Sequence, residues 1–77
     1  MKKLKLYSKD VCPFCKKVIQ YMERHDIKGV EIVDTADPKN HQELIEIGGM
    51  NQVPMLLIDD KPLYESNDII QWFKDNM

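Results

Sequence analysis

The only two cysteines of the chain, Cys12 and Cys15, lie two residues apart in the segment Cys12-Pro13-Phe14-Cys15. Two thiols at this spacing can close and open a disulfide with little movement of the backbone. The segment follows an apolar, strand-like stretch and precedes a helix-like one, and in that context a CxxC pair is typical of a redox centre. We therefore predict thiol–disulfide exchange at Cys12 and Cys15.

The positions of the two thiols predict different roles. Cys12 falls where a helix is expected to begin, and Pro13 suits the first turn because its missing N–H would have no partner there. Free N–H groups and the helix dipole at that end favour a thiolate, the form of cysteine that attacks disulfides. Lysines at positions 9, 16 and 17 add positive charge nearby. We expect Cys12 to be the exposed nucleophile and Cys15, one turn further in, to be the buried thiol that resolves a mixed disulfide.

Two other roles for the pair are a structural disulfide and part of a metal site. A bridge across so short a loop contributes roughly 2 kcal/mol at best by chain entropy, which makes it a poor stabiliser. A closed zinc site usually needs about four ligands. The remaining candidates, His25 and His41, are far away and at no recognised spacing, so we expect no metal site and two exposed helical histidines.

The length and composition predict one domain spanning residues 1–77, with 43% hydrophobic residues. No apolar run approaches membrane-spanning length, and the N-terminus lacks the long apolar segment of a signal peptide. We therefore expect a cytoplasmic protein with no membrane partner. In that reducing compartment a CxxC pair is more often catalytic than structural.

The net charge of −2 is unevenly distributed along the chain. Residues 1–28 carry eight Lys or Arg against three Asp or Glu, whereas residues 29–77 carry three against ten. The basic segment surrounds the cysteines, and a positive rim there would attract an anionic thiol substrate. For Lys2, Lys3 and Lys5 we expect only a solvated face. Nucleic-acid binding is not supported, because the chain is mildly acidic and lacks a basic stripe interleaved with aromatic residues.

Hydrophobic periodicity and turn residues predict seven elements. The expected strands cover residues 3–8, 30–33, 55–58 and 62–64, and the expected helices cover residues 13–26, 38–48 and a last stretch capped by Ser66 or Asn67. The first strand–helix–strand unit predicts parallel pairing through a right-handed crossover, and the turn at Asp59-Asp60 predicts an antiparallel hairpin. The fold class is therefore α/β, with a four-stranded mixed sheet and helices on both faces.

This layout, together with the segment from Ser8 to Cys15, resembles the glutaredoxins of the thioredoxin superfamily over nearly the whole chain. Proline directly after the first cysteine is similar to glutaredoxins, although that family usually has Tyr at the position of Phe14. Gln52-Val53-Pro54 resembles the family's Thr-Val-Pro, whose proline is cis. The resemblance implies a thioredoxin-like fold.

The same resemblance implies a glutathione site beside the cysteines. A cis bond before Pro54 would turn the Val53 backbone outward, where it could pair with a peptide-like ligand. The stretch Ser66-Asn67-Asp68 falls where glutaredoxins bind the γ-glutamyl end of glutathione, and the free N–H groups of a helix start can hold a carboxylate. The implied contacts are Lys9, Phe14, Gln52, Val53, Pro54, Ser66 and Asn67. Because Gln52 replaces Thr and Phe14 lacks a hydroxyl, we expect altered affinity rather than lost chemistry.

These observations favour a monomeric, glutathione-dependent thiol–disulfide oxidoreductase. Its expected substrates are protein disulfides and glutathione mixed disulfides, with glutathione or a similar small thiol as cosubstrate and no bound cofactor. Glu65-Ser66 also looks like the Glu-Ser pair of the amino-terminal domain of glutathione transferases. Since those enzymes need a second, helical domain, the pair supports a glutathione-like ligand more than transferase activity.

Two alternative functions stay open. One is a glutaredoxin-like electron donor to ribonucleotide reductase that is recycled by thioredoxin reductase; such proteins usually carry a Phe-Arg-Pro-Asp-like stretch, which residues 63–68 do not match. The other is an iron–sulfur cluster carrier. Most such relatives have Gly or Ser after the first cysteine, and Pro13 stiffens that loop, which disfavours a cluster.

Overall fold

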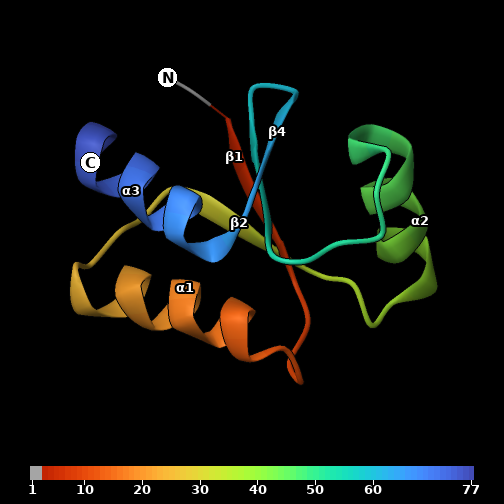
Figure 1. The fold of residues 1–77 in the computed structure, drawn as a ribbon, viewed down its shortest axis with the longest axis horizontal. Coiled ribbons are helices and arrows are strands. Elements are labelled where there is room, and N and C mark those ends of the chain that lie inside the picture. The colour runs from red at the N-terminus through yellow and green to blue at the C-terminus, as the bar shows by residue number, and fades with distance from the viewer. Residues whose placement is uncertain (1–2) are drawn as a thin grey trace.

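The computed structural model describes residues 3–77; residues 1 and 2 of the predicted domain lie outside the described part. The elements, in chain order, are β1 (Leu4–Ser8), α1 (Pro13–Arg24), β2 (Val30–Asp34), α2 (Pro38–Gly48), β3 (Met55–Ile58), β4 (Lys61–Tyr64) and α3 (Ser66–Asn76) (Figure 1). This order and these element types agree with the prediction from periodicity.

The strands form one mixed sheet in the order β2-β1-β3-β4. Strand β1 pairs in parallel with β2, so that Leu6 lies opposite Ile32, and antiparallel with β3, so that Leu6 also lies opposite Leu56. Strands β3 and β4 form the expected antiparallel hairpin. The predicted four-stranded mixed sheet is confirmed.

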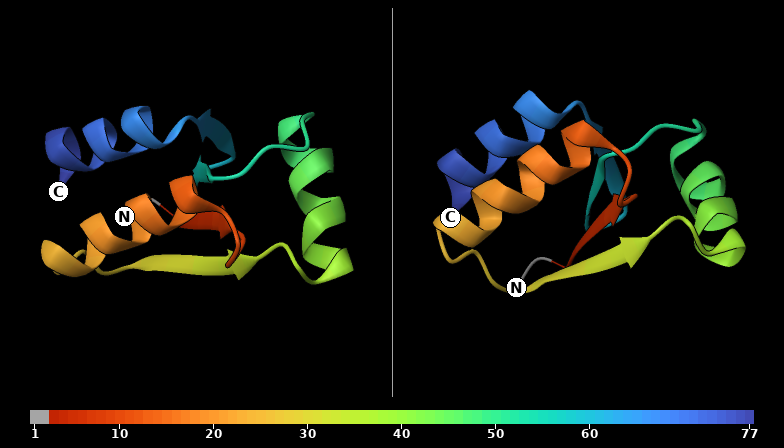
Figure 2. Two further views of the ribbon diagram at one scale, coloured as in Figure 1. Left: turned by 60° about the horizontal axis from the view of Figure 1, so that its bottom comes forward. Right: turned by 90° about the horizontal axis from the view of Figure 1, so that it is seen from below.

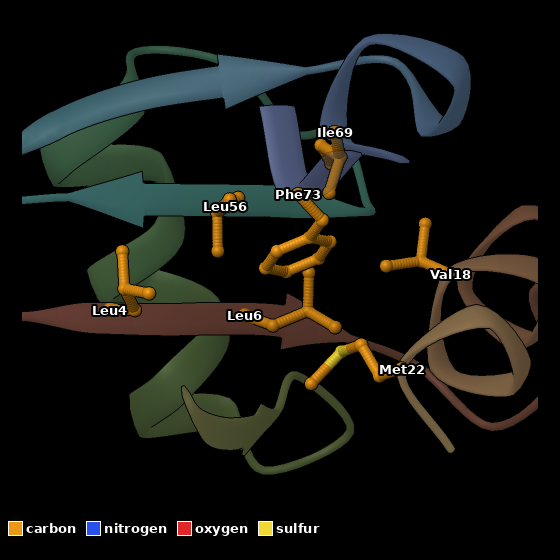
Figure 3. Packing of buried hydrophobic residues seen from close by; sticks show 7 residues of the cluster. All are labelled: Leu4, Leu6, Val18, Met22, Leu56, Ile69 and Phe73. Carbon is orange, nitrogen blue, oxygen red and sulfur yellow. The ribbon is translucent and has the colours of Figure 1, made fainter. Parts of the chain in front are cut away.

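Helices cover both faces of the sheet, as predicted. Helices α1 and α3 lie side by side on one face and α2 lies on the other (Figures 1 and 2). Successive side chains of a strand point to opposite faces, so β1 sends Leu6 toward α1 and α3 and Tyr7 toward α2. Figure 3 shows the first of these layers, which buries Leu4, Leu6, Val18, Met22, Leu56, Ile69 and Phe73.

A second apolar layer joins α2 to the opposite face of the sheet. Its buried members are Tyr7, Val33, Leu44, Met55 and Leu57. Helix α2 begins after Asp37, whose carboxylate accepts the Lys39 N–H at 2.9 Å, and ends before Gly49, which adopts the left-handed conformation with φ of 76°. Aspartate at the N-cap and glycine after the last turn are the residues that favour these helix ends.

The structure corrects two predicted helix ends. Helix α1 stops at Arg24 rather than at residue 26, because the chain turns there and Asp26 takes a positive φ of 49°. The prediction that Ser66 or Asn67 caps the last helix is wrong. Glu65 occupies the N-cap position of α3 with φ of 72° and makes no capping bond through its side chain, while Ser66 is buried in the first turn. An N-cap residue ordinarily has an extended backbone, as Asp37 does before α2. At α3 the chain turns directly from β4 into the helix at Glu65, so no extended residue lies between them.

Candidate thiol–disulfide site

The sheet topology brings three loops to one end of the molecule. Tyr7 of β1 lies opposite Met55 of β3, and Met55 lies opposite Tyr64 of β4, so these three residues form one row across the sheet. The segments that adjoin this row are the turn before Cys12, the loop that ends at Pro54 and the start of α3 at Ser66. Residues more than fifty positions apart in the sequence therefore meet at this end of the sheet.

Cys12 lies at the entrance of α1, as predicted. It is the N-cap residue, with φ of −90° and ψ of 114°, and its sulfur accepts the Cys15 N–H at 3.4 Å. Its own N–H donates to the carbonyl of Lys9 at 3.0 Å, which closes the turn before the helix. The Cys12 thiol is half-buried and donates to the Val53 carbonyl, with 3.9 Å between sulfur and oxygen.

Cys15 has the opposite environment. Its side chain is fully buried against the core and both cysteines are free thiols. Burial, and next the hydrogen bond with the Cys12 side chain, raise the pKa of the Cys15 thiol to about 12. Cys15 therefore keeps its proton at neutral pH, whereas the nucleophilic form of a cysteine is the thiolate.

The Val53–Pro54 peptide bond is cis, as the resemblance implies. Beside it lies a groove of about 260 Å³, lined by Phe14, Gln52, Val53, Pro54, Glu65 and Ser66. Five of the seven glutathione contacts expected from the resemblance are thus brought together in one groove next to Cys12.

The other two expected contacts, Lys9 and Asn67, do not line this groove. Lys9 is exposed in the turn before Cys12. Asn67 is exposed and its side-chain oxygen accepts a hydrogen bond from Lys17 Nζ at 2.6 Å, which links α1 to the start of α3. The sequence indicates for Lys17 only an added positive charge, and its contact with Asn67 joins residues too far apart for sequence periodicity to detect.

Glu65 is a groove residue absent from the expected contacts. Its carboxylate accepts a hydrogen bond from Gln52 Nε2 at 3.2 Å, so the proline loop is tied to the start of α3. The likeness of Glu65-Ser66 to a transferase pair is the signal available in the sequence for this position.

Exposed apolar side chains also lie on both sides of Cys12 in the sequence, since Val11 is 78% and Phe14 is 63% exposed.

The two histidines differ from each other. His25 is exposed but forms the C-cap of α1 rather than part of a helix, which corrects the expectation of a helical residue. His41 lies in α2 and is half-buried, so it is not the exposed residue expected.

Within residues 3–77, no group of three or more His, Cys, Asp or Glu side chains could hold a metal ion. In the same range no helix is long and apolar enough to cross a membrane.

Comparison with known protein families shows the family to which the chain belongs. The model of the family described as "Glutathione S-transferase, N-terminal domain" matches residues 6–77. The chain belongs to this family. A curated relative, the "Uncharacterized glutaredoxin-like 8.6 kDa protein in rubredoxin operon" of Clostridium pasteurianum, is 32% identical over 56 residues, which cover 73% of this chain and 75% of the relative. The glutaredoxin-like character expected from the sequence is confirmed.

Solved structures give the same fold for this glutathione S-transferase N-terminal domain. Glutathione transferase Omega 3C from Trametes versicolor superimposes with a TM-score of 0.82 at 25% identity, over 95% of this chain and 33% of the transferase. Oxidized glutaredoxin 2 from Chlamydomonas reinhardtii superimposes with a TM-score of 0.68 at 24% identity, over 96% of this chain and 73% of the glutaredoxin. The predicted thioredoxin-like fold is confirmed, and the chain spans about a third of the length of the transferase.

Proposed function

We propose that the chain is a glutathione-dependent thiol–disulfide oxidoreductase in which Cys12 is the nucleophile and Cys15 the resolving thiol. The observation that carries this proposal is the contrast between a half-buried Cys12 at the start of α1 and a fully buried Cys15 one turn away. A backbone N–H directed at the Cys12 sulfur favours negative charge on it, as expected at a helix start. The membership of the glutathione S-transferase N-terminal domain family supports glutathione as the small thiol.

In the first step the Cys12 thiolate attacks a glutathione mixed disulfide on a protein. The bond between the two sulfurs of the substrate breaks, the protein leaves as a thiolate that takes up a proton, and glutathione stays on Cys12. A second glutathione then attacks this mixed disulfide through its own thiolate. Cys12 is released as a thiolate and oxidised glutathione leaves, so the two electrons come from glutathione.

A protein disulfide requires both cysteines. The Cys12 thiolate attacks one sulfur of the disulfide, the bond between the two protein sulfurs breaks, one protein thiolate leaves and the other sulfur stays bonded to Cys12. Cys15 passes its proton to the first protein thiolate and attacks the Cys12 sulfur, so that the Cys12–Cys15 bridge forms and the second protein thiolate leaves and takes up a proton from water. Two glutathione molecules then reduce the bridge and become oxidised glutathione. We propose that no bound cofactor takes part and that the protein acts in a reducing compartment, the cytoplasm.

The groove beside Cys12 supports binding of glutathione in an extended form. The main chain of Val53 lies against Cys12, which suits pairing with the backbone of the cysteinyl residue of glutathione. Ser66 and Asn67 at the start of α3 offer N–H groups to the γ-glutamyl carboxylate. Lys9, in the turn before Cys12, supplies a positive charge for the other carboxylate, and Phe14, Gln52 and Pro54 form the walls.

The proposal is tested with a glutathione mixed disulfide of a peptide, using glutathione and glutathione reductase to follow turnover. We expect Cys12→Ser to abolish turnover, because no other thiol of the chain is exposed to the substrate. Cys15→Ser should retain part of the deglutathionylation activity, since this route needs one cysteine, but should lose reduction of protein disulfides. Equal and complete loss in both variants would exclude the single-thiol route, and full activity of Cys12→Ser would exclude the proposed nucleophile.

A second electron source is favoured by one observation, the rubredoxin operon for which the Clostridium pasteurianum relative is named. In this second candidate function the Cys12–Cys15 bridge is reduced by a protein reductase and the chain passes electrons to another enzyme. The same assay, run with thioredoxin reductase in place of glutathione, separates the two functions by the reductant that sustains turnover.

A further inference from the structure

The segment that carries Val53 is a loop held by two neighbouring side chains. Residues 50–54 connect α2 to β3 without regular secondary structure. The amide of Gln52 donates to Glu65 at 3.2 Å, beside the groove. One residue earlier, the side-chain oxygen of Asn51 lies 2.7 Å from Nε2 of His41, in α2. The loop is therefore attached to α2 and to the start of α3 immediately before Val53, the residue that faces Cys12.

Helix α2 is a firm point of attachment for Asn51. Leu44 is fully buried between α2 and the sheet, and the carboxylate of Glu43 accepts a hydrogen bond from the buried Tyr7 hydroxyl of β1. At its end, Gly48 lies so close to Tyr64 of β4 that there is no room for a side chain. Because α2 is fixed against the sheet, the hydrogen bond from His41 holds Asn51 at a fixed position relative to the sheet.

We propose that His41 is a positioning residue, which fixes the Val53 segment opposite Cys12 through its hydrogen bond to Asn51. This inference rests on the proposed function, because its consequence for activity requires the Val53 main chain to pair with the substrate. The Val53 carbonyl lies 3.9 Å from the Cys12 sulfur, two residues after the attachment point. A segment that pairs with an extended ligand binds more tightly when it is ordered beforehand, because less conformational entropy is lost on binding.

His41 does not touch the reacting sulfurs, so it acts on binding more than on chemistry. Removal of its ring leaves Asn51 without its partner and allows the loop to sample other conformations. We expect His41→Ala to raise KM for a glutathione mixed disulfide by about three- to tenfold, the range of one net hydrogen bond, with kcat nearly unchanged. His41→Gln, whose amide can donate to the same oxygen, should recover part of this loss.

Helix α2 supplies a matched control. Gln42, the next residue, is exposed and makes a hydrogen bond of 3.0 Å with Glu46 within the helix, away from the loop. Gln42→Ala therefore removes a side-chain hydrogen bond of the same helix but should leave KM unchanged. Asn51→Ala should reproduce His41→Ala, and the double variant should be no worse than either single variant, because both remove one interaction.

Backbone order parameters of residues 50–53, from nitrogen-15 relaxation, test the positioning role without relying on activity. We expect His41→Ala and Asn51→Ala to lower these order parameters from about 0.85 toward about 0.6, and Gln42→Ala to leave them unchanged. Unchanged order parameters in His41→Ala, or an equal decrease in Gln42→Ala, would overturn the inference. Lower order parameters with unchanged KM would overturn its link to binding. If the wild type shows no turnover while His41→Ala lowers the order parameters, the positioning stands and the proposed function fails.

Discussion

Cys12 and Cys15 are three positions apart, yet the fold gives them separate chemistry. Cys15 is fully buried, whereas Cys12 is half-buried at the helix entrance, and the N–H of Cys15 points at the Cys12 sulfur. The order of events in the proposed reaction follows from this difference. The accessible sulfur meets the substrate first, and the buried thiol acts after the mixed disulfide has formed on its neighbour.

The protonation of Cys15 makes the stability of the reduced protein depend on pH. Its pKa rises from an ordinary value of 9.0 to about 12 in the folded protein. Because the unfolded chain releases this proton at lower pH, the contribution to stability is fully present below the ordinary pKa and is lost as pH rises toward the folded one. We expect the free energy of unfolding of the reduced wild type to fall more steeply above about pH 9 than that of Cys15→Ser.

Urea denaturation under reducing conditions at several pH values between neutrality and the folded pKa measures this difference. Burial also raises the pKa values of Tyr7 and Tyr64, but these tyrosines are present in both proteins. The difference between the two curves therefore isolates Cys15. Curves that stay parallel over the whole range would contradict the pKa inferred for the buried thiol.

The two buried tyrosine hydroxyls of the α2 face provide a second test at the residue scale. The Tyr7 hydroxyl donates to Glu43, whereas the Tyr64 hydroxyl is buried without a hydrogen-bond partner among the described residues. Tyr7→Phe should lower the free energy of unfolding by about 1–3 kcal/mol, because it removes a bond to a carboxylate. Tyr64→Phe should raise it by about 1 kcal/mol, because it removes an unpaired polar group. Equal losses for the two variants in urea denaturation would contradict this account.

At the scale of elements, α2 and β4 approach each other at Gly48. A Cβ on Gly48 would overlap the Tyr64 hydroxyl and would lie 3.0 Å from the sulfur of Met55. Gly48 belongs to the helix, so its role comes from this close contact rather than from a special backbone conformation. Gly49, the next residue, has a positive φ of 76°, and a Cβ at this position would have no neighbouring atom within 4 Å.

This contrast predicts which alanine can be rescued. Gly48→Ala should destabilise the protein by about 1–3 kcal/mol through overpacking, although alanine is the better helix former. In the Tyr64→Phe background Gly48→Ala should cost less than in the wild type, because the overlapping oxygen is gone. Gly49→Ala should cost about 1 kcal/mol through its left-handed conformation, and this cost should be the same in both backgrounds. Urea denaturation compares each alanine variant with its own background, and an equal reduction of both costs would contradict the close contact.

The elements were predictable from the sequence because their signals are local. Alternating and helical apolar patterns indicate the strands and helices, and Asp37 with Pro38 marks the start of α2. The error at the start of α3 has a physical reason, since Glu65 takes a positive φ of 72° at the turn from β4, and this turn rather than the capping preference of Ser66 sets where the helix begins. The contacts of Lys17 with Asn67 and of His41 with Asn51 escaped prediction, because they depend on packing between elements.

At the scale of the whole molecule, strand order decides where charge and chemistry meet. The end of β1, the beginning of β3 and the end of β4 lie side by side at the row of Tyr7, Met55 and Tyr64. This places the proline loop and the start of α3 beside the cysteines. Of the basic residues of segment 1–28, Lys9 lies in the turn before Cys12, and Lys16 and Lys17 lie near the start of α1. The opposite end of the sheet holds the β3–β4 turn at Asp59 and Asp60, where Asp59 pairs with the main chain of Lys3 before β1.

This arrangement predicts that the reaction with an anionic thiol depends on salt. Exposed basic residues near Cys12 raise the local concentration of glutathione at low ionic strength, and salt screens this attraction beyond about 10 Å at 0.1 M. We expect kcat/KM for glutathione to fall by about two- to fivefold between low and physiological ionic strength. Lys16→Glu, in the first turn of α1, should lower the low-salt value and flatten this dependence. The matched variant Lys61→Glu, at the far end of the β3–β4 hairpin, should do neither. A neutral disulfide in single-turnover experiments should react with Cys12 at a rate nearly independent of salt, since no charge is attracted. If the neutral disulfide showed the same salt dependence as glutathione, the effect would lie in the protein's conformation and not in the attraction of the substrate.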